Sequence, residues 1–139
     1  MYGTQPLAAS PLAGLLLFDE GEDTMPKIMP NVIALPNGGL QVSWMNIKAS
    51  DTCVAVGHQE LTRRCVQVDG AFDNGTLGLK GSQDGEDFLF LKDENGTQAN
   101  YGEAAMAQLQ QVPLYTKPVL GGSPGGACSI NVTMTMAKP

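Results

Sequence analysis

Apolar and polar residues alternate most clearly near the C-terminus of the chain. Between residues 127 and 137, every second side chain is apolar: Cys128, Ile130, Val132, Met134 and Met136. Ser, Asn and Thr occupy the positions between them. Because successive side chains of a strand point to opposite faces, this period of two predicts a strand with one buried and one wet face.

Seven further segments have the composition of short strands. Residues 76–82 repeat the alternation, whereas residues 87–92 are apolar on both faces and predict a strand covered on each side, as in a homodimer or homotrimer. The other five predicted strands are residues 31–35, 40–47, 52–56, 61–68 and 114–120. Turns containing Asn-Gly, Asp-Gly or Gly-Gly separate them. About eight short strands at this spacing predict an all-β fold, a β-sandwich and most simply a jelly roll.

Three positions refine this picture. Trp44 shares a strand face with Leu40 and Val42, which predicts that its ring is buried. Pro118 has no N–H for a ladder, so its strand should be an edge strand or bulged. Residues 103–111 contain strong helix formers and no β-branched residue, and Pro113 follows them, so we expect one short helix there.

The first thirty residues differ in kind from the rest. Prolines at 6, 11, 26 and 30 disfavour a regular ladder, which predicts an extended N-terminal arm over residues 1–30 and a sandwich domain over residues 31–139. The arm carries an apolar run that must be buried against its own sandwich or against another chain. The predicted interface residues are therefore those of this run and of the apolar segment 87–92: Leu12, Leu15, Leu16, Leu17, Phe18, Phe88 and Phe90.

Charge and hydropathy exclude several partners. Only 16% of the residues are charged, and the net charge of −6 argues against binding to nucleic acid or to an anionic membrane. The longest apolar runs are far shorter than the ~20 residues of a membrane span. No Lys or Arg precedes Lys27, so the run that begins at Leu12 does not have the pattern of a signal peptide. We therefore expect a protein made and used without export.

Catalytic and metal-binding residues are not predicted. The single histidine, His58, falls at a predicted hairpin tip, and one histidine is too few for a cupin-type metal centre. The odd number of cysteines fits a reducing compartment; Cys53 and Cys65 flank the predicted hairpin, and they are interpreted as buried small hydrophobic residues. No GxSxG, GxGxxG or P-loop motif is present. We expect no enzyme activity, no cofactor and no metal.

Two acidic loops leave one alternative open. The carboxylates of Asp84, Glu86, Asp87, Asp93 and Glu94 flank a single predicted strand. Calcium takes six to eight oxygen ligands, which loops of this composition could supply. Asp-Gly and Asn-Gly are also the commonest hairpin turns, and neither loop has an EF-hand pattern. Solvated turns are therefore the preferred interpretation.

The order of turns and strands in residues 70–137, about half of the chain, resembles that of a known family. It comprises Gly81-Ser82-x-Asp84-Gly85, then Leu91-x-Asp93, then Pro113-x-Tyr115-x-x-Pro118, a glycine-rich turn and the final alternating strand. This pattern resembles capsid decoration (cement) proteins of tailed bacteriophages, of the β-sandwich or jelly-roll type. The N-terminal arm has no counterpart in it.

The resemblance implies a mechanical function. Such proteins sit on the capsid exterior, contact the major capsid protein and clamp its subunits together, without catalysis or cofactor. It would place this chain on the virion after synthesis in the host cytoplasm. The alternative is a carbohydrate- or receptor-binding module of a phage tail or cell-wall protein. A sugar binder should expose a groove lined by Trp44 or the tyrosines, whereas a cement protein should carry its apolar patch on the arm and a sheet edge.

Overall fold

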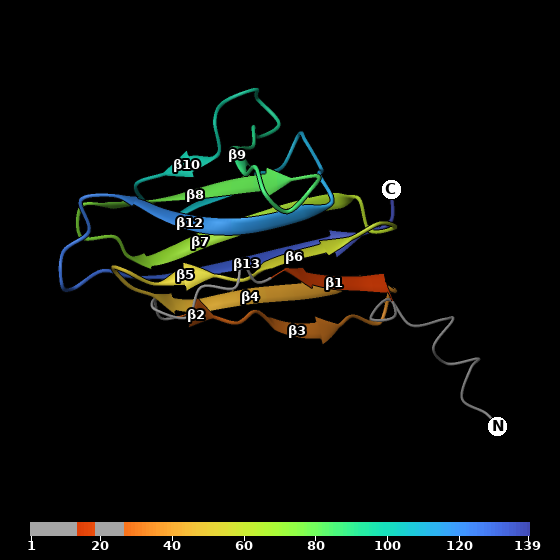
Figure 1. Cartoon of the computed structure of the whole chain (residues 1–139), viewed down its shortest axis with the longest axis horizontal. Coiled ribbons are helices and arrows are strands. Elements are labelled where there is room, and N and C mark those ends of the chain that lie inside the picture. The colour runs from red at the N-terminus through yellow and green to blue at the C-terminus, as the bar shows by residue number, and fades with distance from the viewer. Residues whose placement is uncertain (1–13, 19–26) are drawn as a thin grey trace.

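The computed structural model describes residues 14–18 and 27–139. These residues form strands and no α-helix, arranged as two stacked sheets with a small third one beside them (Figure 1). The strands are β1 (Leu15–Phe18), β2 (Lys27–Ile28), β3 (Asn31–Ala34), β4 (Leu40–Ile47), β5 (Thr52–Cys53), β6 (Ala55–His58), β7 (Arg63–Ala71), β8 (Gly75–Ser82), β9 (Leu89–Phe90), β10 (Asn100–Tyr101), β11 (Ala105–Gln108), β12 (Tyr115–Gly122) and β13 (Ser129–Ala137).

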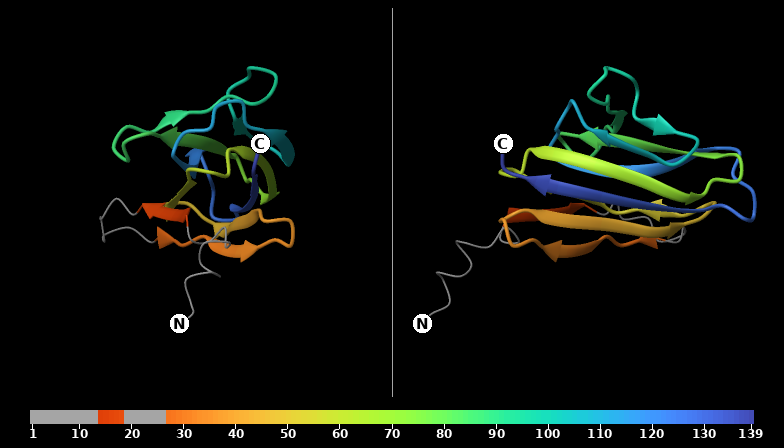
Figure 2. Two further views of the ribbon diagram at one scale, coloured as in Figure 1. Left: turned by 90° about the vertical axis from the view of Figure 1, so that its right-hand side faces the viewer. Right: turned by 180° about the vertical axis from the view of Figure 1, so that it is seen from behind.

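The chain passes repeatedly between the two main sheets. One sheet has six strands in the order β1-β6-β12-β8-β10, with β9 also paired to β8, and the other has five in the order β11-β7-β13-β4-β3. The last two strands therefore lie inside the sheets, β12 between β6 and β8 and β13 between β7 and β4. Figure 2 shows the sheets packed face to face. The predicted all-β sandwich is confirmed.

Alternate residues of the long strands build the core between the sheets. Trp44 of β4 is fully buried, as predicted, and its indole Nε1 donates a hydrogen bond to the Val54 carbonyl at 2.9 Å. Leu77 and Leu79 of β8, in the facing sheet, belong to the same buried cluster. Burial of each such side chain contributes about 1.5–3 kcal/mol, so this cluster is the main source of stability.

The prediction that Pro118 lies on an edge or bulged strand is wrong for β12 as a whole, which runs between β6 and β8 without a bulge. Strand β12 pairs with β8 along its whole length but with β6 only at Tyr115 and Thr116. At Pro118 the strand therefore has a ladder on one side only, and the missing N–H costs no bond.

The predicted helix over residues 103–111 is wrong. Its centre is strand β11, which pairs antiparallel with β7, Ala105 opposite Val68 and Gln108 opposite Cys65. Ala107 is buried by this pairing, whereas Met106 points outward. Helix propensity differs by only a few tenths of a kcal/mol per residue, and the free edge of β7 offers these residues a complete ladder.

The prediction that the N-terminal segment joins no ladder is also wrong. Strand β1 pairs antiparallel with β6, and β2 pairs in parallel with β5. All four prolines fall outside Leu15–Phe18, so this run keeps every N–H that a ladder needs. Leu12 and the side chain of Phe18 lie outside the described residues.

The predicted strand 52–56 and the hairpin after it are corrected as well. The strand is broken into β5 and β6 at Val54. Cys53 and Cys65 lie in different sheets and do not flank one hairpin. His58 is the buried last residue of β6 rather than the tip of a hairpin, and its Nδ1 accepts a hydrogen bond from the Glu60 N–H at 3.1 Å.

Candidate binding groove

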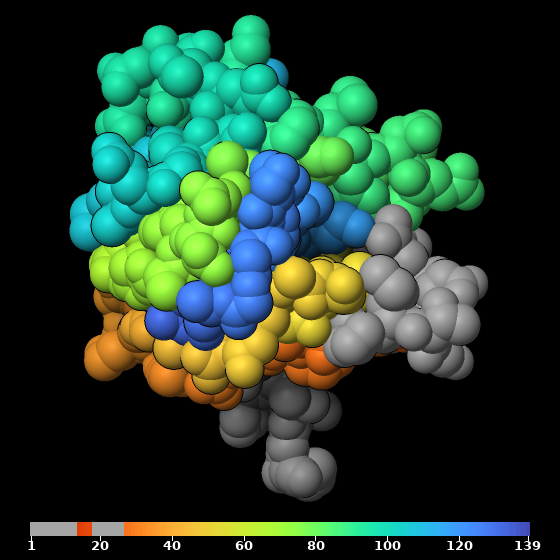
Figure 3. All heavy atoms as spheres, turned by 90° about the vertical axis from the view of Figure 1, so that its left-hand side faces the viewer, coloured from red at the N-terminus to blue at the C-terminus, as the bar shows by residue number. Residues whose placement is uncertain are grey.

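Residues 83–104, between β8 and β11, form a layer of loops and two short strands, β9 and β10, along the edge of β8 that does not face β12. In Figure 3 these residues, coloured green to teal, stand above the two sheets, and the loop after β8 projects to one side. Strand β9 folds back on the end of β8, with Phe90 opposite Lys80 and Leu89 opposite Gly81. The predicted strand 87–92 is thus reduced to these two residues.

Two glycines of β8 allow the rings of Phe90 and Pro113 to pack directly against this strand. A Cβ atom at Gly78 would overlap the Phe90 ring, and one at Gly81 would overlap the Pro113 ring. Both glycines are buried. Their missing side chains therefore leave the space that the returning segment fills.

Two lysines hold the phenylalanine rings of this segment. Lys80 and Lys117 are opposite each other on β8 and β12. The Lys80 ammonium lies 4.6 Å from the centre of the Phe90 ring, and the Lys117 ammonium lies 4.2 Å from the centre of the Phe88 ring. Each cation–π contact contributes about 0.5–1 kcal/mol at an exposed site, so the pair fixes the segment at two points.

The loop that leads into β9 is held by its own side chains. Asp84 Oδ1 accepts hydrogen bonds from Ser82 Oγ at 2.8 Å and from the N–H groups of Glu86 at 2.8 Å and Asp87 at 3.0 Å. Ser82 Oγ in turn accepts the Gly85 N–H at 2.8 Å. Bonds from the Glu86 and Asp87 amides, followed by that of Ser82, lower the pKa of Asp84 to about 2.

This pKa makes the loop sensitive to acid. Ionised Asp84 stabilises the folded loop above about pH 4, and the contribution is lost as the pH falls toward 2, because the folded-state pKa lies below the unfolded one. We expect Ser82→Ala to raise the pKa of Asp84 and Ser123→Ala to leave it unchanged. An NMR titration of the side-chain carboxyl carbon measures both, and equal values in the two variants would contradict this account of the loop.

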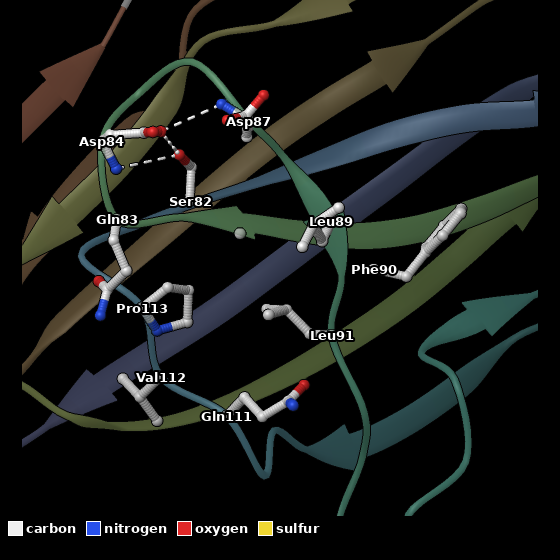
Figure 4. A pocket seen from close by; sticks show the side chains of 11 residues that line it. Ser82, Gln83, Asp84, Asp87, Leu89, Phe90, Leu91, Gln111, Val112 and Pro113 are labelled. Carbon is white, nitrogen blue, oxygen red and sulfur yellow. Dashed lines mark hydrogen bonds between the residues drawn. The ribbon is translucent and has the colours of Figure 1, made fainter.

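A groove of about 460 Å³ lies between this loop, β9 and the chain that returns to β12 (Figure 4). Its lining residues are Gly81, Ser82, Gln83, Asp84, Asp87, Leu89, Phe90, Leu91, Gln111, Val112 and Pro113. Two glutamines join its walls. Gln83 Oε1 accepts the Leu114 N–H at 2.7 Å, and Gln111 Oε1 accepts the Lys92 N–H at 3.0 Å. Hydrogen bonds therefore connect the walls of the groove, and its volume is one that binding sites in proteins commonly have.

The groove has an exposed apolar side. Leu89 is 71% exposed and Phe90 39% exposed, although both are large apolar side chains. They sit on a two-residue strand at the border of the six-stranded sheet. Exposed apolar side chains grouped beside a groove are typical of interaction sites.

Only some of the predicted interface residues meet here. Phe88 and Phe90 lie in the layer beside β8, whereas Leu15, Leu16 and Leu17 lie on β1, at the far end of the same sheet. Leu15 packs against the core, and Leu17 is 48% exposed. Sequence reasoning missed Leu89 and the two glutamines. Leu89 belongs to the apolar run that singled out its neighbours, but nothing local marks a glutamine that joins two walls.

The described residues show no arrangement for metal chemistry. No group of three or more His, Cys, Asp and Glu side chains among them could hold an ion. Asp93 is one of the residues considered for calcium, and its Oδ1 accepts hydrogen bonds from the N–H groups of Asn95 and Thr97 in its own turn.

The thiols of Cys53 and Cys128 are buried, and burial raises the pKa of Cys53 to about 12. In the described part of the chain, no helix has the length and apolar character for crossing a membrane.

Comparison with known proteins adds only distant likenesses. No family model matches the chain, and no curated protein matches it. Among solved structures, CsCBM6-3 of Clostridium stercorarium in complex with cellobiose is 12% identical over 88% of both chains, with a TM-score of 0.31. The CBM22-1–GH10 modules of Clostridium thermocellum xylanase 10B, complexed with xylohexaose, are 13% identical over 94% of this chain and 27% of theirs, with a TM-score of 0.33. The enzymatically active domain of bacteriophage CBA120 tailspike protein 4 is 10% identical over 94% of this chain and 19% of its own, with a TM-score of 0.23. None of these three is a capsid decoration protein.

Proposed function

We propose that the protein is a non-catalytic assembly protein that decorates the exterior of a phage capsid. It docks on the major capsid protein through the groove and the exposed apolar residues beside it. The observation that carries the proposal is the exposure of Leu89 and Phe90 on a short border strand of the sandwich. Self-association as a homodimer or homotrimer and residence on the virion after synthesis in the host cytoplasm belong to the same proposal.

The positions of the aromatic residues favour assembly over sugar binding. Trp44 is fully buried, and neither Tyr101 nor Tyr115 lines the groove. Exposed apolar side chains occur on both main sheets, and among them Leu89 and Phe90 are neighbours beside the groove. This distribution supports a protein partner, because protein interfaces combine an apolar centre with few charges.

Carbohydrate binding is the second candidate, and one observation favours it. Phe90, Gln83 and Gln111 all line the groove, and aromatic rings and amides are groups that sugars contact. Soluble oligosaccharides titrated into the labelled protein test this directly. Chemical-shift changes at the groove would support sugar binding in place of the capsid function.

The capsid function is tested by binding to undecorated capsids. We expect the wild-type chain to bind them and Leu89→Ser to bind about tenfold or more weakly, because an exposed leucine that becomes buried contributes about 1.5–3 kcal/mol. Met106→Ser is the matched control, since Met106 is 69% exposed on the opposite sheet, in β11. Thermal melts verify that both variants fold. Failure of the wild-type chain to bind capsids, or equal binding by Leu89→Ser, would overturn the proposal.

A further inference from the structure

The groove carries negative charge at one end. Asp84 and Asp87 both line it, and both are exposed. Within the described residues, neither carboxylate forms an ion pair with a lysine or arginine. Hydrogen bonds alone account for the low pKa of Asp84, without contribution from a cation. This end of the groove therefore holds two carboxylates with no positive partner from the described part of the chain.

The lysines of β8 and β12 contact aromatic rings and not these carboxylates. Lys80 stacks on Phe90, and Lys117 stacks on Phe88. Moving either ammonium to the carboxylates would give up its contact with the ring. The charge at the groove is thus available to a cation from outside.

The other side of the groove is apolar. Leu89 and Phe90 line it and are exposed. Val112 and Pro113 come from the chain across the groove from Leu89 (Figure 4). A ligand that contacts both the apolar side and the two carboxylates of the groove needs an apolar group and a positive charge a short distance apart. An extended peptide with Lys or Arg beside a bulky apolar residue has this combination.

We infer that the groove receives an extended segment of the partner protein in which a Lys or Arg flanks a bulky apolar side chain. The inference rests on the proposed function and specifies the partner's docking segment. A second copy of this chain is a poorer occupant, because each copy carries a net charge of −6. A neutral sugar would leave both carboxylates without a counter-charge.

Binding of a minimal peptide to the full chain tests the inference. The probe is a five-residue, acetylated and amidated peptide with Lys-Phe-Lys at its centre, titrated into ¹⁵N-labelled protein. Two matched peptides replace both lysines with Glu or the Phe with Ala. We expect shifts confined to the groove, weakened by salt, and at least tenfold weaker binding of either matched peptide. No shifts at millimolar peptide, shifts elsewhere, or equal binding of the Glu peptide would overturn the inference.

Two protein variants identify the charge that is involved. Asp87→Asn should weaken the Lys-Phe-Lys peptide several-fold, and it keeps the backbone N–H that bonds to Asp84. Glu103→Gln removes an exposed acidic charge outside the groove and should have no effect. Equal affinity of Asp87→Asn and the wild-type chain would overturn the inference.

The capsid assay separates this inference from the proposed function. If the wild-type chain binds capsids, Leu89→Ser does not, and Asp87→Asn binds as well as wild type, the charged segment is wrong while the capsid function stands. If the wild-type chain does not bind capsids, the proposed function fails, whereas the peptide titration still reports on the groove itself.

Discussion

Arg64→Met is expected to lower the free energy of unfolding by about 3 kcal/mol or more. Arg64 of β7 is 1% exposed. Its guanidinium donates to the carbonyls of Leu61 at 3.3 Å, Pro113 at 2.9 Å and His58 at 3.2 Å, and to Thr116 Oγ1 at 2.9 Å. Methionine fills similar space but donates nothing, so these acceptors lose a charged donor in the protein interior.

The neighbouring arginine provides the control. Arg63 is exposed, and Arg63→Met should change the free energy of unfolding by no more than about 0.5 kcal/mol. Burial lowers the pKa of the Arg64 guanidinium to about 10, which leaves it charged at neutral pH. Arg64→Lys keeps a charge but not the planar fork of donors, so we expect it to recover only part of the loss. Urea unfolding measures all three variants, and equal effects of Arg63→Met and Arg64→Met would contradict this role.

Gly57→Ala is expected to cost about 2–3 kcal/mol of stability. Gly57 lies at the centre of β6, opposite Leu16 of β1 and Tyr115 of β12. A Cβ atom there would overlap the carbonyl oxygen of Leu114, which is backbone and has no rotamer to change. The start of β12 must therefore move away from β6, and ladder hydrogen bonds are lost.

Gly126→Ala is the matched substitution. A Cβ atom at Gly126 meets nothing within 4 Å, so this variant should stay within about 0.5 kcal/mol of the wild-type stability. Chemical unfolding followed by circular dichroism measures the difference between the two alanine variants. If Gly57→Ala proved as stable as Gly126→Ala, the close packing of β6 on β12 would be refuted.

Both sites support one wall of the groove. Arg64 holds the Pro113 carbonyl, and Gly57 admits the Leu114 carbonyl, directly after the groove residues Gln111 to Pro113. The position of this wall is thus set by the inside of the sandwich. A partner that binds the groove would contact a surface fixed by buried residues, which lowers the entropy lost on binding.

The sequence alone determined the long strands and their turns. Strict alternation predicted the C-terminal strand, and the burial of Trp44 followed from the apolar residues on its own face. The Asp73-Asn74 turn also follows from local chemistry, since both residues have positive φ, which Asp and Asn tolerate. These features need only neighbours along the chain. Local patterns therefore define them completely.

Only the tertiary structure decided where the segments with weak or conflicting local signals would go. Residues 105–108 have helix propensity but form β11, because the edge of β7 offers them hydrogen bonds worth more than that propensity. Leu15–Phe18 enters the sandwich for the same reason, at the edge of β6. Arg64 is buried because acceptors separated from it by up to 52 positions converge on its guanidinium. The groove exists because β8, β9 and residues 111–113 meet in space, and no local pattern encodes a meeting of segments that are distant in sequence.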